Sequence, residues 1–301
     1  MKSWLPTAQD ADCFFLRRRT GLLAAFCALL SGCSATGVLN TLVPKDTFRA
    51  NRGIAYGAHP RQQIDVYQPL TPPAGGPPPP LVIFFYGGNW KAGERGDYLF
   101  VAEALASRGA VVLIPDYRLY PEVRYPDFLH DSADAVRWAF ENARNLGFDP
   151  ARVHVMGHSA GAYNAAMLAL DPRWLGPVRQ RLAGFIGLAG PYDFLPIGNP
   201  DTQRAFNWPA TPPDSQPLRH ATRESPPSLL LAARSDNLVD PVRNTVALAE
   251  RLQSLGVPVR VQLFGGVSHV TLVGALAPPL RRLAPVLPEV LDFIGLAAAP
   301  S

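Results

Sequence analysis

From residue 81 onward, the chain alternates short apolar runs with stretches of helical character. Residues 81–86 (LVIFFY) and 111–117 (VVLIPDY) are continuous enough in apolar side chains for strands buried on both faces of a sheet. Helical stretches follow near 97–108 and over 129–146, and the runs FIGLAG, LLLAA and VRVQLF continue the series. This repeated alternation predicts an α/β fold with a mainly parallel sheet and helices on both faces.

Two shorter strands are predicted before this series, at 53–57 and 62–68, near an edge of the sheet. The intervening stretch 71–80 (TPPAGGPPPP) predicts a stiff surface connector, because proline locks φ and strands bracket it closely. The sequence contains no internal repeat, and its amino-acid composition does not change along the body in a way that would indicate a second domain. We therefore expect one α/β domain over 53–296, after a linker at 33–52 and before a tail at 297–301.

The N-terminal segment has the layout of an export signal. Three arginines at 17–19 precede the apolar run 21–30, which is too short for a bilayer that needs roughly 20 residues. Leu30, Ser31, Gly32 and Cys33 resemble the bacterial lipobox, which predicts a signal peptide over 1–32 and a lipid on Cys33. An ordinary signal peptide that happens to contain Cys33 is the alternative. Ser34 in place of Asp favours outer-membrane over inner-membrane anchoring.

Cysteine usage and charge exclude several classes of function. The cysteines are Cys13, Cys27 and Cys33, so the body has no disulfide framework, thiolate metal site or cysteine nucleophile. The formal net charge of +4 includes the arginine cluster of the export segment and gives no reason to expect nucleic acid. No HxH or HExxH cluster occurs, and we expect neither a metal nor an organic cofactor.

The segment 154–166 (HVMGHSAGAYNAA) contains a G-x-S-x-G motif centred on Ser159. A strand-like run at 153–156 precedes it and an Ala-rich helical run at 160–170 follows, which is the placement of a nucleophile elbow. Such a turn presents the serine Oγ at a helix N-terminus, where the backbone N–H of Ala160 faces a developing oxyanion. The alternative is a strand–turn–helix junction without chemistry.

A second set of oxyanion donors is predicted directly after the strand at 81–86. The stretch FFYGGNW, residues 84–90, places two glycines where the backbone N–H groups are unshielded. The N–H groups of Gly88 and Asn89 are the candidates that would complete an oxyanion hole with Ala160. An ordinary Gly-Gly turn is the alternative.

These motifs together resemble the α/β-hydrolase carboxylesterases, in particular bacterial esterases related to hormone-sensitive lipase and the BD-FAE-like group. The resemblance rests on YGGNW, on DYRLYPE at 116–122 and on GHSAG, and it covers about 53–296. It implies an eight-stranded α/β-hydrolase fold with a small cap or loop insertion and a serine esterase activity without cofactor. Tyr86 stands where the family usually has His, which predicts altered packing of the loop or an altered acyl pocket.

The family's chain order is serine, acid, histidine. Asp236 lies at the family's G-x-x-D-x-x-V position, with Ala233 in place of the glycine, and is the favoured acid. Asp193, one strand earlier, and the neighbouring Asp240 are alternatives, each of which could instead be a loop carboxylate or a helix N-cap.

His269 is the only histidine C-terminal to all three acids, and it follows the strand VRVQLF and a glycine-rich loop. A surface histidine is its alternative interpretation. His158 lies within the elbow and is expected to point elsewhere, and His220 sits in a polar loop before Asp236. The resemblance then implies that Ser159, Asp236 and His269 form a catalytic triad.

The substrate is the least constrained feature. The Pro-rich segment 191–227 could form a small cap, in which Phe206 and Trp208 line an acyl or aryl pocket or pack the cap itself. No long apolar lid is present, which favours short-chain or aryl esters as the small-molecule partner. An amidase resembling kynurenine formamidase and a non-catalytic envelope binding protein are the alternatives. The only membrane contact expected is the lipid anchor, and nothing indicates the oligomeric state.

Overall fold

The computed structural model describes residues 35–70 and 76–296, which contain one eight-stranded sheet. The strands are β1 (Phe48–Ala55), β2 (Gln63–Pro69), β3 (Leu81–Phe85), β4 (Val111–Pro115), β5 (Val153–His158), β6 (Leu182–Leu188), β7 (Ser228–Ala233) and β8 (Val259–Phe264). Their order in the sheet is β1-β2-β4-β3-β5-β6-β7-β8. β2 pairs antiparallel with β1 and β4, and all other neighbouring strands are parallel. The predicted mainly parallel sheet is confirmed.

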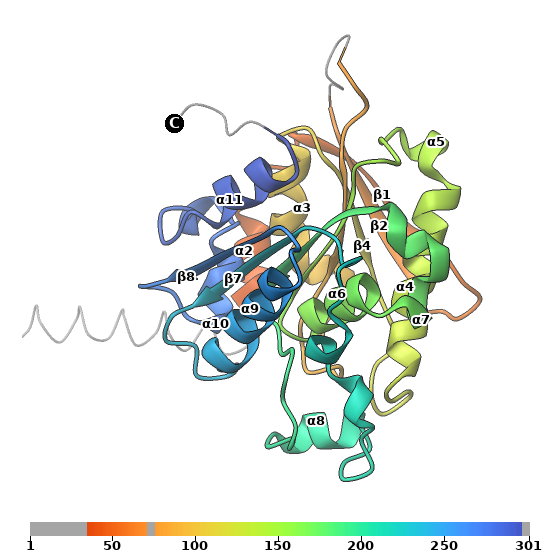
Figure 1. The fold of residues 1–301 in the computed structure, drawn as a ribbon. Coiled ribbons are helices and arrows are strands. Elements are labelled where there is room, and N and C mark those ends of the chain that lie inside the picture. The colour runs from red at the N-terminus through yellow and green to blue at the C-terminus, as the bar shows by residue number, and fades with distance from the viewer. Residues whose placement is uncertain (1–34, 71–75, 297–301) are drawn as a thin grey trace, which may run out of the picture.

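Helices cover both faces of this sheet (Figure 1). The α-helices are α2 (Ala35–Thr41), α3 (Leu99–Ala106), α4 (Asp127–Glu141), α5 (Ala143–Leu146), α6 (Ala160–Leu170), α7 (Pro172–Leu175), α8 (Pro200–Ala205), α9 (Ala247–Ser254), α10 (His269–Gly274) and α11 (Val286–Phe293). Short 3-10 turns lie at Arg95–Tyr98, Gly176–Arg181, Pro213–Ser215, Pro217–His220 and Pro278–Leu280, and a π-helical turn at Val242–Val246. α6 packs on β3, β5 and β6, whereas α3 packs on β2 and β4.

The core is centred on β3, β4 and β5, in which every residue is buried. Each large apolar side chain buried there contributes about 1.5–3 kcal/mol to the free energy of unfolding. The outer strand β8 alternates between half-buried and exposed residues over most of its length, because only one of its faces is covered. The apolar runs that lack alternation in the sequence are therefore the central strands.

The largest differences between the element boundaries and the sequence-based expectation lie in two regions. The helix expected at 129–146 divides into α4 and α5 at Asn142, whose side-chain amide donates to the Trp138 carbonyl over 2.8 Å. β1 begins at Phe48, and α2 lies within the range expected to be a linker. Asn40 of α2 holds this segment to the body by donating to the Gly96 carbonyl and accepting from the Phe100 N–H.

The connection between β6 and β7 is the predicted small insertion, and it carries α8 away from the sheet (Figure 1). The predicted signal peptide and Cys33 lie outside the described residues. Among the helices of the described part, none combines the length and the apolar character that crossing a membrane requires.

The parallel strands place four segments at one edge of the sheet. Residues that follow β3, β5, β7 and β8 meet there, because the carboxyl ends of parallel strands share an edge. All residues predicted for the site lie on these four segments or on the insertion after β6.

Candidate active site

Ser159 occupies a sharp turn between β5 and α6. Its backbone adopts φ 55° and ψ −124°, a conformation that costs a non-glycine residue on the order of 1–3 kcal/mol. Glycines on both sides make the turn possible. A Cβ on Gly157 would lie 2.2 Å from the Gly161 carbonyl oxygen, and one on Gly161 would lie 2.0 Å from that of Phe85. The motif therefore folds as the strained strand–turn–helix junction that the sequence predicts.

His269 is the first residue of α10, where the fold fixes both its backbone and its ring. Ser268 caps this helix by accepting from the Thr271 N–H, and the Thr271 hydroxyl accepts from the Ser268 N–H in return. The Nδ1 of His269 lies 2.7 Å from Oδ2 of Asp236, which follows β7. Because a carboxylate only accepts, we assign the ring proton to Nδ1, which leaves Nε2 free to accept a proton.

Asp236 is held as a carboxylate. Its side chain is inaccessible to solvent, and Oδ1 accepts the backbone N–H groups of Leu238 and Val239 over 2.9 and 3.0 Å. Burial opposes the charge, but the hydrogen bonds from His269 and from these two N–H groups outweigh it. The pKa of Asp236 therefore lies below its usual value.

The two alternative acids have other partners. Asp193 pairs with Arg243 over 3.3 Å. Asp240 accepts the backbone N–H groups of Val242 and Arg243 at the start of the π-helical turn. Of the three candidate carboxylates, Asp236 is the one hydrogen-bonded to His269.

The loop after β3 is held in a left-handed backbone conformation. Gly88, Asn89 and Trp90 have φ values of 129°, 52° and 57°. The Gly88 carbonyl accepts the backbone N–H groups of Lys91 and Ala92. A Cβ at Gly88 would lie 2.1 Å from the Ala92 carbonyl oxygen. This glycine is therefore required by the shape of the loop.

Trp90 anchors the same loop to the body of the domain. Its indole N–H donates to Asn164 of α6 over 2.9 Å, and its carbonyl accepts the Tyr120 N–H over 2.8 Å. Asn89 and Ala160, two of the three predicted oxyanion donors, line one cavity with Ser159, and Gly88 directly precedes Asn89.

Tyr86, which replaces the usual histidine, belongs to a buried polar network beneath this loop. Its hydroxyl donates to Asp116 over 2.7 Å and accepts from Arg61 over 3.0 Å. Its ring stacks on those of Tyr98 and Tyr117, with centroids 5.8 and 4.8 Å away. Tyr86 therefore bears on the packing of the loop, one of the two effects predicted, and does not line the cavity.

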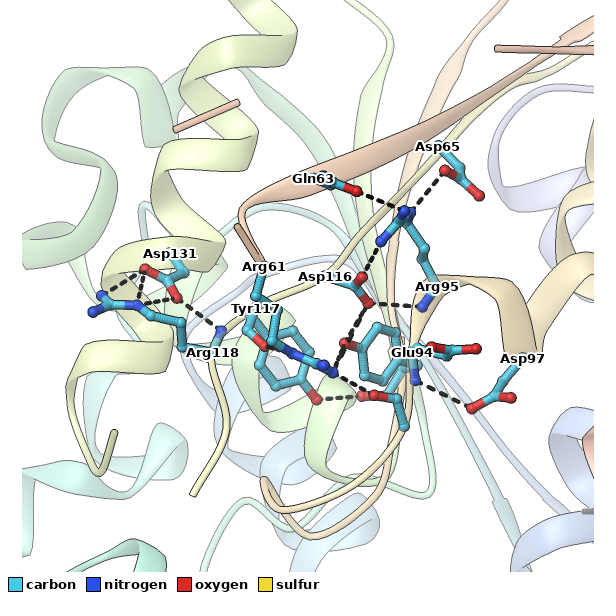
Figure 2. A network of polar contacts seen from close by, with 12 residues as sticks. Arg61, Gln63, Asp65, Glu94, Arg95, Asp97, Asp116, Tyr117, Arg118 and Asp131 are labelled. Atoms are coloured by element: carbon cyan, nitrogen blue, oxygen red, sulfur yellow. Dashed lines mark hydrogen bonds and ion pairs between the residues drawn. The ribbon is translucent and has the colours of Figure 1, made fainter. Parts of the chain in front are cut away.

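Around Tyr86 this network pairs two arginines, Arg61 and Arg95, with two carboxylates, Asp65 and Asp116. Figure 2 shows it from close by, together with the neighbouring pair of Arg118 and Asp131. Arg95 donates to both Asp65 and Asp116, and Arg61 reaches Asp116 and the Gly93 carbonyl. Burial raises the pKa of Tyr86 well above its usual value, and Tyr117 and Asp116 act in the same direction. The Tyr86 phenol therefore stays protonated and keeps donating to Asp116 across the pH range of ordinary assays.

The cavity beside Ser159 has a volume of about 400 Å³. Its walls include the loop after β3, the start of the insertion and the segment after β7: Asn89, Trp90, Phe194, Ile197, Asn199, Thr202, Leu238 and Arg243. His269 reaches the same space. Side chains of both polar and apolar character thus surround Ser159.

The two aromatic residues predicted for the insertion do not line this cavity. Phe206 is fully buried in a cluster with the rings of Trp90, Tyr163 and Phe194. Trp208 is half-buried against the core. Of the two predicted roles, packing the cap is the one these residues have. Phe194 supplies the aromatic wall instead, because it lies where the insertion leaves the sheet edge.

The expectation that His158 points away from the site is wrong. Its Nε2 lies 3.0 Å from the carbonyl oxygen of His269, and the two rings are 4.9 Å apart. The sequence carries no signal for this contact beyond the position of His158 inside the G-x-S-x-G motif, because the partners are 111 residues apart. Asn164, the partner of Trp90, was missed for the same reason.

Within residues 35–70 and 76–296, no group of three or more His, Cys, Asp or Glu side chains is arranged to hold a metal ion. The groups gathered around the cavity are a serine on a strained turn, an imidazole paired with a carboxylate, and backbone N–H groups of a helix start and a left-handed loop. Such a set can activate a hydroxyl nucleophile and stabilise an oxyanion.

The sheet order and the elbow define the chain as a protein of the α/β-hydrolase fold. A profile of the BD-FAE family matches residues 64–252, more than half of the chain, and the chain belongs to this family.

Two curated relatives are esterases by name. The chain is 29% identical to the esterase LipC of Mycobacterium tuberculosis over 68% of its length, and 26% identical to the isoprenylcysteine alpha-carbonyl methylesterase of Arabidopsis thaliana over 77%. These alignments cover 55% and 59% of the two relatives. The chain thus spans less than two thirds of the length of either protein.

Solved esterase structures share the fold at low sequence identity. A Pyrobaculum calidifontis esterase superposes with a TM-score of 0.70 at 23% identity, covering 86% of this chain and 89% of that one. Esterase B from Lactobacillus rhamnosis superposes with a TM-score of 0.71 at 20% identity, covering 93% and 96%. At these identities the similarity shows a common fold.

Proposed function

We propose that this chain is a serine carboxylic-ester hydrolase that works through an acyl-enzyme. The observation that carries the proposal is the 2.7 Å hydrogen bond between His269 and the buried Asp236, at a cavity that His269 shares with Ser159 on its strained turn. A loop carboxylate and a surface histidine would have no reason to have their side chains buried against each other in this way. The esterase names of the relatives support the same class of reaction.

In the first half of the reaction, His269 Nε2 takes the Ser159 hydroxyl proton as Oγ attacks the acyl carbon. The carbonyl oxygen becomes an oxyanion, which accepts the backbone N–H groups of Ala160 and of the loop at Gly88 and Asn89. Asp236 holds the Nδ1–H tautomer and stabilises the imidazolium that forms. His269 then protonates the leaving alcohol oxygen as the ester C–O bond breaks, leaving an acyl group on Ser159.

In the second half, water takes the place of the alcohol. His269 removes one proton from the water as its oxygen attacks the acyl carbon, and the same donors hold the second oxyanion. The bond to Ser159 Oγ then breaks and His269 returns the proton to that oxygen. The carboxylic acid leaves, and the His269 imidazole has carried the proton in each transfer of both halves.

Short-chain or aryl esters are the substrate class that we propose for this site. The cavity of about 400 Å³ lies at the small end of the usual range for small-molecule sites. Trp90, Phe194 and Ile197 provide apolar walls for a small acyl or aryl group, while Asn89 and Asn199 provide polar ones.

The test is hydrolysis of p-nitrophenyl esters with acyl chains from C2 to C12 by the full-length chain, beside Ser159→Ala. We expect the highest kcat/KM at the short end and loss of turnover in the variant. A fluorophosphonate should label the wild-type protein with a stoichiometry of about one and leave Ser159→Ala unlabelled. Folded wild-type protein that neither turns over esters nor reacts with the fluorophosphonate would exclude the proposal and favour a binding protein.

The amidase alternative is tested in the same assay. A p-nitroanilide with the acyl group of the best ester replaces the ester oxygen by nitrogen at the same carbonyl. An esterase should hydrolyse the ester much faster than the anilide, whereas comparable rates would favour the amidase.

We also propose that the chain is exported and lipidated at Cys33. The support is the sequence alone, namely the arginines at 17–19, the apolar run and the lipobox-like Leu30, Ser31, Gly32 and Cys33. Metabolic labelling with palmitate in a bacterial host should mark the wild-type chain and spare Cys33→Ser. Equal labelling of both, or of neither, would contradict lipidation at this residue.

A further inference from the structure

His158 ties the nucleophile turn to the backbone of His269. It is the last residue of β5 and immediately precedes Ser159, whereas His269 begins α10 far along the chain. The Nε2 of His158 lies 3.0 Å from the His269 carbonyl oxygen. A carbonyl oxygen only accepts, so Nε2 must carry the proton and donate it.

The same side chain also supports the oxyanion loop. A Cβ built on Gly87 would lie 3.3 Å from Nδ1 of His158, 3.1 Å from its carbonyl oxygen and 3.0 Å from Cβ of Ser159. The loop that carries Gly88 and Asn89 therefore passes directly over His158. His158 lies between the two segments that must keep a fixed distance from Ser159.

His158 also remains neutral beside an imidazole that changes charge. It is buried, and Nδ1 has no hydrogen-bond partner among the described residues. Burial and the neighbouring His269 charge lower the pKa of His158 to about 3, and the hydrogen bond to the His269 carbonyl and the charge of Asp236 oppose this shift only in part. The titratable groups that face His158 are thus His269 and Asp236. The Nε2–H donor of His158 therefore stays in place when His269 gains a proton.

We propose that His158 is a positioning residue for His269, acting through the hydrogen bond from its Nε2 to the His269 carbonyl. This inference rests on the proposed serine mechanism. Asp236 fixes the orientation of the His269 ring through Nδ1. His158 fixes the position of the His269 backbone through its carbonyl oxygen. Loss of the donor would let α10 shift relative to Ser159, and a displacement of about 1 Å can cost on the order of 100-fold in rate.

The decisive comparison is between His158→Gln and His158→Met in the full-length chain. The two replacements have the same length, but only the glutamine amide can donate to the His269 carbonyl. With the best p-nitrophenyl ester we expect His158→Met to lower kcat about 10- to 100-fold with KM within about twofold. His158→Gln should recover most of that loss.

His154 supplies a matched control on the same strand. It lies at the other end of β5, is also buried, and its ring packs against Phe293 of α11. His154→Gln and His154→Met should differ from each other by less than about threefold in kcat. Thermal unfolding of all four variants separates loss of folded protein from loss of rate, and His158→Leu replaces His158→Met if the latter does not fold.

The possible outcomes distinguish a failure of the positioning role of His158 from a failure of the proposed esterase function. Equal kcat in folded His158→Gln and His158→Met, with an active wild type, would overturn the positioning role and leave the esterase proposal intact. A loss spread equally over the His154 pair would also overturn it, because the effect would then be general. Absence of turnover and of fluorophosphonate labelling in the wild type would remove both.

Discussion

Asp236 determines which nitrogen of the His269 ring carries the proton. Its replacement by asparagine keeps the shape of the side chain but allows the opposite ring tautomer of His269, with Nε2 protonated. Under the proposed mechanism, we expect Asp236→Asn to lower kcat by about 10⁴-fold, which is the loss known for the same change in a serine-protease triad. Steady-state kinetics with the best p-nitrophenyl ester measures this effect.

Asp193→Asn and Asp240→Asn are the matched controls, since both were alternatives for the same role. Asp193 is paired with Arg243 and Asp240 caps a helical turn, so each change should alter kcat by less than about tenfold. A loss in Asp193→Asn as large as that in Asp236→Asn would mean that the acid was wrongly assigned.

The Tyr86 hydroxyl should contribute to stability through its two partners, the buried Asp116 and the half-buried Arg61. Tyr86→Phe removes one hydrogen bond each from Asp116 and Arg61, and we expect the free energy of unfolding to fall by about 1–3 kcal/mol. Tyr120→Phe, in a half-buried ring under Arg124, controls for the loss of a phenol and should change stability by less than about 0.5 kcal/mol. Urea denaturation compares the two, and equal midpoints would contradict the prediction.

The partnership of Asp236 and His269 could be predicted because motif and chain order identify strand ends that share a sheet edge. The contact between His158 and the His269 carbonyl could not be predicted, because it depends on where the loop after β8 places the start of α10. The network around Tyr86 was hidden for a related reason. Its partners Arg61 and Asp116, and Arg95, which donates to Asp116, lie on three separate segments whose approach only the folded chain defines.

At the scale of elements, an aromatic cluster joins the insertion to the loop after β3. The ring of Phe206 lies 4.7 Å from that of Trp90 and 5.3 Å from those of Tyr125 and Phe194. Phe206→Ala should lower the free energy of unfolding by about 3–5 kcal/mol, because it opens a cavity in a fully buried cluster.

Trp208→Ala is the comparison for this change, as the half-buried Trp208 lies two residues further on. It should cost clearly less than Phe206→Ala in the same urea titration, despite the larger side chain removed. A greater loss in Trp208→Ala would mean that the half-buried ring, and not the cluster, holds the insertion in place.

Elements with uninterrupted patterns could be predicted closely from the sequence. α6 has the predicted bounds because the elbow fixes its start, and β3 and β4 begin where their apolar runs begin. β1 begins five residues before the predicted strand, because the five residues that follow its buried Phe48 are exposed and carry no run of apolar side chains. The short turns of the insertion follow proline positions and tertiary contacts rather than a periodic pattern.

The stability of the whole molecule should depend on pH through two buried histidines. Burial lowers the pKa of His154 to about 4 and that of His158 to about 3. In the unfolded chain both titrate near 6.5, so the unfolded state binds more protons between these values. Stability is therefore fully present above about pH 6.5 and falls as the pH drops through that value.

Each histidine should account for a loss of about 2 kcal/mol between pH 7 and pH 5. Urea denaturation at the two pH values measures the sum for the wild-type chain. In His154→Met the difference between pH 7 and pH 5 should shrink by about half, whatever the stability of the variant at pH 7. A difference unchanged by this substitution would show that His154 does not stay neutral in the folded protein.

The insertion after β6 leaves the sheet and returns to β7, which is the next strand in the sheet. Residues 185–188 of β6 pair with 228–231 of β7 regardless of what lies between them. This stretch can therefore change in length during descent without altering the pairing of the strands that precede Ser159, Asp236 and His269. Under the proposed function, descendants of this chain with different ester preferences should therefore differ first between residues 189 and 227.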